Sequence, residues 1–156
     1  MLRVAGLLSV VCAIAMPAAA AAAPQDFASG GGHIDFGVGA GTVNFTGHGS
    51  PANAHGQVHL NIDNTGAFED LKGRVDCVTV EGNEASLSGA FTRGPSGFPE
   101  FRYFVLAVRD NGNPPNATAD EVDMLISSEP VPCSIEFFPA TSPFAQGNAV
   151  VKDRTS

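Results

Sequence analysis

The sequence predicts an all-β protein: an antiparallel β-sandwich or a partly open barrel of about eight short strands, with one disulfide, preceded by a helical signal peptide. Three observations predict this fold. Apolar side chains recur at every second residue through most of the chain, which is the period of a half-buried strand. Gly, Pro, Asn and Asp cluster between these runs, as expected of turns. After residue 32, no stretch keeps the apolar spacing of a helix.

The first 22 residues form the predicted signal peptide. Arg3 supplies a basic tip, residues 4–16 are an apolar run, and Pro17 and an alanine tract follow. A charged tip, a short apolar stretch and small residues at the cleavage point are typical of secretory signal peptides. The alternative is a permanent membrane anchor, but a spanning helix needs about 20 strongly apolar residues. We therefore expect a secreted, extracellular or periplasmic protein with no membrane span after cleavage.

The rest of the chain is long enough for one domain. Residues 23–32 are small and end in three consecutive glycines, so we expect a flexible linker there. Residues 33–156 then form the single β domain.

Each expected strand is defined by a set of alternating residues that share one face. In chain order the sets are Val43, Phe45 and Gly47; Val58, Leu60 and Ile62; Val75, Cys77 and Thr79; Ala85, Leu87, Gly89 and Phe91; and Val122, Met124 and Ile126. Mostly polar residues lie between them, as expected of strands with one buried face. Residues 101–108 are apolar on both faces, which predicts a central strand. Residues 134–138 and 148–152 are expected to be shorter closing strands.

Cysteine usage predicts a disulfide. Cys12 leaves with the signal peptide, so Cys77 and Cys133 remain as an even pair in an exported protein. Two free thiols are the alternative. A bridge that closes a loop of this length stabilises the fold by about 4 kcal/mol in the chain-entropy model. It would tie the closing strands to the middle of the sheet.

The charge of the chain excludes some partners. The formal net charge is −8, and loss of Arg3 with the leader makes it −9. Such a field repels nucleic-acid phosphates and anionic lipid, and no cluster of Lys or Arg in the sequence offsets it. We therefore expect no nucleic-acid binding, while calcium remains compatible with the charge.

Four segments together resemble a class of exported bacterial domains. They are residues 41–45, 78–85, 108–114 and 147–151. The pattern is similar to the post-COAP-type domain of secreted bacterial proteins, over roughly residues 31–153. The chain departs from the pattern by extra residues at 115–119. The resemblance implies an all-β extracellular domain whose function is not established, and it supplies no catalytic residues.

The longest polar loop offers a candidate calcium site. Calcium takes six to eight oxygen ligands, and Asp110, Asn111, Asp120 and Asp123 could supply several. The spacing differs from the helix-flanked calcium loop, because Gly112 comes too early and no Glu closes it. The alternative is a long hairpin connection whose Asp and Asn side chains bond their own backbone.

Histidines offer an alternative metal site, of the kind that binds zinc. His55 and His59 would lie about 13 Å apart on a straight strand, too far to share one ion. His48 could approach His55 across the intervening turn. The alternative is that these histidines are solvent-exposed.

The sequence shows no catalytic motif, so the favoured function is a non-catalytic extracellular module that binds an unknown ligand or surface. The first alternative is a secreted hydrolase with acidic residues in a sheet groove, using Glu69 with Asp70 or Glu100 with Asp123. The second is a calcium-stabilised structural module.

Overall fold

The computed structural model describes residues 25–37, 39–62, 66–112, 118–134 and 141–154. They form nine strands. These are β1 (Asp26–Asp35), β2 (Ala40–Gly49), β3 (His55–Ile62), β4 (Leu71–Glu81), β5 (Glu84–Arg93), β6 (Tyr103–Arg109), β7 (Glu121–Ser127), β8 (Ser142–Pro143) and β9 (Gln146–Lys152). Across these residues no helix has the length and apolar character to cross a membrane. The predicted signal peptide lies outside the described residues.

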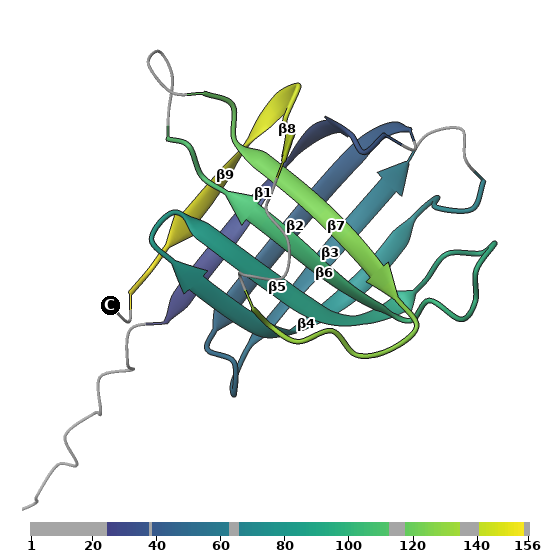
Figure 1. Ribbon diagram of the computed structural model, residues 1–156, viewed down its shortest axis with the longest axis horizontal. Coiled ribbons are helices and arrows are strands. Elements are labelled where there is room, and N and C mark those ends of the chain that lie inside the picture. The colour runs from purple at the N-terminus through teal and green to yellow at the C-terminus, as the bar shows by residue number, and fades with distance from the viewer. Residues whose placement is uncertain (1–24, 38, 63–65, 113–117, 135–140, 155–156) are drawn as a thin grey trace, which may run out of the picture.

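All nine strands belong to one curled antiparallel sheet, which confirms the predicted all-β fold in its partly open barrel form. The strand order is β8-β7-β6-β5-β4-β3-β2-β1-β9. Eight strands, β1 to β8, therefore follow one another as a simple meander, each paired with the next. In Figure 1, β5, β6 and β7 pass in front of β1, β2 and β3, and the core lies between these two layers.

The last segment of the chain joins the two edges of the sheet. β8 pairs with β7, and β9 pairs with β1. Between them, Phe144 N donates a hydrogen bond to the carbonyl of Asp120, and Ala145 N donates to that of His33, both at 2.9 Å. The two edge strands of the sheet, β8 and β9, are thus consecutive parts of one stretch of chain.

The alternation predicted from the sequence is confirmed for most strands. The predicted apolar faces of β2, β3, β5 and β7 point into the core, which contains Val43, Phe45, Val58, Leu60, Ile62, Ala85, Leu87 and Val122. β6 is buried on both faces, as predicted for a central strand. Phe104 and Leu106 face the core, whereas Val105 and Ala107 are buried on the outer side.

The predicted flexible linker at residues 23–32 is wrong for the part that the structure describes. Residues 26–32 form most of β1, paired with β2 on one side and β9 on the other. The glycines of β1 allow neighbouring side chains to pack closely against the strand. A Cβ atom at Gly30 would lie 2.7 Å from Cζ of Phe45, and one at Gly32 would lie 2.7 Å from Cδ1 of Phe144.

The predicted face of Cys77 is also wrong. β4 contains a bulge at Asp76: Val75 pairs with Gly89, and Cys77 pairs with the adjacent Ser88. Neighbouring residues of a strand point to opposite faces, so Val75 faces the core and Cys77 faces outward. Because of the extra residue, odd-numbered residues of β4 such as Val75 face the core before the bulge, and the even-numbered Val78 and Val80 face it afterwards.

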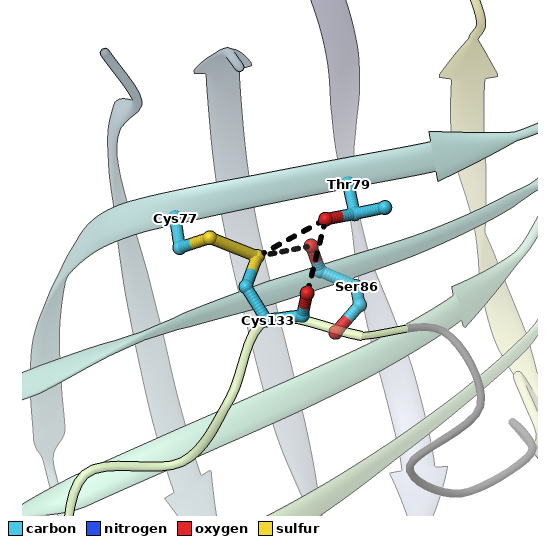
Figure 2. The surroundings of a disulfide bond; sticks show 4 residues. All are labelled: Cys77, Thr79, Ser86 and Cys133. Atoms are coloured by element: carbon cyan, nitrogen blue, oxygen red, sulfur yellow. Dashed lines mark hydrogen bonds between the residues drawn. A yellow bond between two sulfur atoms is a disulfide. The ribbon is translucent and has the colours of Figure 1, made fainter. Parts of the chain in front are cut away.

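The predicted disulfide between Cys77 and Cys133 is present, with the two Cα atoms 5.9 Å apart. It fastens residues 128–134, here named the strap, to the outside of the sheet. Figure 2 shows Cys133 over β4 and β5, where the hydroxyl of Thr79 donates to the Cys133 carbonyl at 3.3 Å. The expected strand at residues 134–138 lies almost wholly outside the described residues.

The strap crosses a buried part of the outer face. Four outward-facing residues are nearly inaccessible to solvent, namely Ser86, Ser88, Val105 and Ala107. They lie on the rungs that contain Cys77 and Thr79. This half of the outer face is therefore a second, smaller packed layer.

Candidate binding groove

The other half of the outer face is open and contains a hollow. Its volume is about 740 Å³, and it extends across β1 to β5. The residues that line it are Gly30, Asn44, Phe45, Thr46, Gly56, Gln57, Val58, His59, Lys72, Gly73, Arg74 and Thr92. We call this hollow the groove.

Strand register builds the two walls of the groove. The first wall is a rung in which Asn44 pairs with His59 and His59 with Lys72. The second wall is a parallel rung two residues away along each strand. Here Thr46 pairs with Gln57 and Gln57 with Arg74.

The floor is the backbone between these rungs, at the row that contains Phe45 and Val58. Side chains in that row point into the core, so the floor presents backbone to solvent. Two residues along a strand span about 7 Å, which is the separation of the walls. From β1 to β5 the groove crosses four strand spacings, about 19 Å.

The groove is open at its β1 end. On β1 the outward positions next to the walls are Ser29, which pairs with Thr46, and Gly31, which pairs with Asn44. A small hydroxyl and a missing side chain leave the walls low at this edge. An extended molecule could therefore lie across the strands and continue beyond the groove.

The groove is cationic, although the chain carries a net charge of −8. Lys72 and Arg74 line it, and Arg93 follows Lys72 on the first rung. The remaining polar side chains along it carry amides, hydroxyls or imidazole, and no Asp or Glu is among its lining residues.

One carboxylate joins the cations at the rim of the first wall. Asp70 Oδ1 lies 2.8 Å from His59 Nε2 and 3.2 Å from Lys72 Nζ, and its Oδ2 is bonded by Arg93. The hydrogen bond from His59, together with that from Lys72, lowers the pKa of the Asp70 carboxyl below its ordinary value of 3.8. The first wall therefore has a counter-ion within the protein, which Lys72 and Arg93 share.

The second wall has no such counter-ion. In the described part of the chain no ion pair involves Arg74, which is exposed. An exposed Arg in a hollow presents five N–H donors in a planar array that suits carboxylate and phosphate-like groups.

A second, apolar hollow of about 250 Å³ lies on the inner side of the sheet, between residues of β3 and β7. Leu60, Leu71 and Met124 line it, with Phe36, Ile62, Phe68, Asp123 and Ile126. Phe68 also stacks on Phe98, with ring centroids 5.7 Å apart.

The candidate calcium residues do not converge on one point. Asp120 is buried and accepts hydrogen bonds from the backbone N–H groups of Asn111 at 2.7 Å and Ala149 at 2.6 Å. Asp110 accepts from the backbone N–H groups of Gly112 at 2.9 Å and Val151 at 3.1 Å. These carboxylates bond N–H groups of the loop itself and of β9.

The fourth candidate lies elsewhere in the hydrogen-bond network. Asp123 accepts from the Thr141 hydroxyl at 3.0 Å and from its neighbour Met124 N at 2.8 Å. No group of three or more His, Cys, Asp or Glu among the described residues could hold a metal ion. The calcium site stays a prediction without a geometric basis here.

The three candidate histidines separate into two places. His48 and His55 are cross-strand partners whose rings stack with centroids 5.3 Å apart, as the turn between them allows. Phe27 packs on the other side of His48, at 4.7 Å. His59 lies farther along β3, in the Asp70 cluster.

Sequence reasoning missed the groove, although its polar residues occupy the faces that the alternation assigned to solvent. The spacing of Asn44 with Thr46, Gln57 with His59, and Lys72 with Arg74 was visible as three polar pairs. Their alignment into two walls depends on strand register. The alternation does not fix the register, because a shift of two residues leaves every side chain on the same face.

No family model, curated protein or solved structure matches this chain. The resemblance to the post-COAP-type domain therefore stays a prediction, and the function must be argued from the geometry of the groove.

Proposed function

We propose that this protein is an exported, non-catalytic binding module that holds an extended polar polymer, such as a polysaccharide, in the groove. The observation that carries the proposal is the alignment of two polar walls across an open backbone floor. This arrangement leaves amide, hydroxyl, imidazole and cationic side chains unburied along one line.

The shape of the groove favours a polymer over a small molecule. Small-molecule sites enclose most of their ligand. This groove is instead open at β1, and its length of about 19 Å could accommodate several sugar units. Asn44, Gln57 and Thr92 offer both donors and acceptors to hydroxyl groups.

An extracellular location agrees with two features of the chain. The disulfide between Cys77 and Cys133 is of the kind that persists in oxidising compartments. The sequence of residues 1–22 predicts an export signal.

A retention experiment tests the proposal. The mature, oxidised protein is passed over insoluble and immobilised polysaccharides, both neutral and acidic, and compared with the variant Gln57→Ala. Loss of one amide that bonds the ligand should weaken binding by about fivefold. Asn61→Ala is the matched control, because Asn61 is another exposed amide of β3 that does not line the groove.

Retention of the parent protein with selective loss in Gln57→Ala supports the groove as the binding site. If no polysaccharide retains the protein, or if both variants bind as the parent does, the proposal is wrong.

A further inference from the structure

We infer that the polymer bound in the groove carries carboxylate or sulfate groups, and that Asp70 occupies the position of one such group in the free protein. This inference rests on the proposed function, since it concerns the same groove. It adds the chemical class of the ligand and a competing contact within the chain.

The cluster around Asp70 is already a complete carboxylate-binding site. Three cationic or N–H-donating side chains from three strands, His59, Lys72 and Arg93, converge on its two oxygens. Charge-assisted hydrogen bonds of this kind also bind carboxylate and sulfate groups of ligands. All three donors lie on the first rung, and His59 and Lys72 line the groove.

Asp70 adopts a left-handed backbone conformation in the turn before β4. It is the one non-glycine residue in the described part of the chain with a positive φ, of 52°. Gly adopts this conformation without steric cost, and Asp and Asn are the residues with a side chain that tolerate it best. Asn can therefore replace Asp70 with the same backbone, so that this substitution tests the charge.

The contacts of Asp70 are exposed and exchangeable. The side chains of His59, Lys72 and Arg93 are 46%, 50% and 64% exposed in these pairs, and that of Asp70 is 35% exposed. Exposed ion pairs are weak and form and break readily. An incoming anionic group can therefore replace Asp70 without first removing any buried group.

Arg74 supplies the first contact for such a ligand. It lies on the opposite wall and has no ionic partner among the described residues, so it is available before Asp70 moves. An anionic polymer that bonds Arg74 brings its next charged groups to the first wall, where they compete with Asp70. Because a ligand must displace the Asp70 carboxylate, a ligand with one charged group binds weakly. Ligands that carry repeated charged groups are favoured.

A chemically matched pair of polymers tests the inference. Polygalacturonate carries one carboxylate on each sugar, and its methyl ester has the same backbone without the charges. We expect the mature protein to bind polygalacturonate at least about tenfold more tightly than the ester, and added NaCl should weaken only the former.

Three variants locate the effect. Asp70→Asn removes the competing charge and tolerates the positive φ, so it should bind polygalacturonate about fivefold more tightly. Arg74→Gln should bind about fivefold more weakly. Lys152→Gln is the control: it removes one positive charge from exposed β9, outside the groove, and should change binding by less than about twofold. Asp70→Gly serves as a second test of the carboxylate if Asp70→Asn folds poorly.

The outcomes separate the two proposals. If the ester binds as tightly as polygalacturonate, the groove still binds polymers but the anionic class is wrong. If polygalacturonate binds better but both Asp70 variants bind as the parent does, the competing role of Asp70 is wrong. If neither polymer nor any other polysaccharide binds, the proposed function itself fails.

Discussion

The outer face of one sheet contains two halves with opposite properties. Under the strap, outward-facing residues of β5 and β6 are nearly fully buried, and a disulfide fastens the cover. Across β2 to β4, the outward-facing residues are polar, cationic and exposed. β4 belongs to both halves, since it contributes Lys72 and Arg74 to the groove and Cys77 and Thr79 to the covered half.

The bulge at Asp76 explains how one strand serves both halves. Before it, even-numbered residues of β4 face outward; after it, odd-numbered residues do so. The change of phase lets Val75, Val78 and Val80 all face the core while polar and cysteine side chains face outward. The bulge therefore accommodates Asp76 while Cys77 and Thr79 face outward and Val78 and Val80 face the core.

The largest expected effect follows from removing the disulfide. The double variant Cys77→Ser and Cys133→Ser frees the strap, and the chain-entropy model predicts a loss of about 4 kcal/mol. Release of the strap should also expose Val105 and Ala107, which a fluorescent apolar dye would report. A midpoint equal to that of the parent protein would mean that the strap stays in place without its covalent bond.

Packing under the strap can be measured against an uncovered position of the same rung. Val105 and Leu125 are cross-strand partners, but Val105 is fully buried and Leu125 is 38% exposed. Val105→Ala should cost about 2 kcal/mol, and Leu125→Ala about 0.5 kcal/mol. Equal losses in thermal or urea unfolding would argue against a packed layer beneath the strap.

In the open half, substitutions of outward-facing residues should change the free energy of unfolding very little. Arg74 is exposed, so Arg74→Gln should change the free energy of unfolding by no more than about 0.5 kcal/mol. This variant is expected to lose ligand affinity while it keeps its fold, which near- and far-UV circular dichroism would verify. A large loss of stability would mean that Arg74 supports the fold and that the groove is a structural surface.

The smallest expected effect concerns Asp70 and pH. Because His59 and Lys72 lower the pKa of Asp70 in the folded state, its contribution to stability is present above the ordinary value of 3.8 and is lost as pH falls below that value. The difference in melting temperature between the parent and Asp70→Asn should therefore shrink as pH falls below 3.8. A difference that stays the same or grows below that pH would contradict the assignment.

Much of the fold could be predicted because it depends on local pattern. Alternation along β2, β3, β5 and β7 identified the core-facing residues, and the two apolar faces of residues 101–108 identified a central strand. The cysteine count identified the bridge. The glycines of β1 led to the wrong prediction of a linker, because a flexible linker and a tightly packed strand can contain the same small residues. Whether a glycine avoids a neighbouring side chain such as Phe45 depends on which strands pair, which local sequence does not state.

The sequence by itself determined that this chain forms sheet, which side chains most strands bury, and that Cys77 is paired with Cys133. Tertiary structure alone decided the register, the bulge at Asp76 and the alignment of polar residues into two walls. The physical reason is that a two-residue period specifies the face of each residue but leaves its cross-strand partner open. Partners are chosen by packing and hydrogen bonding over the whole sheet, and a binding surface made of partners therefore appears only when the sheet is assembled.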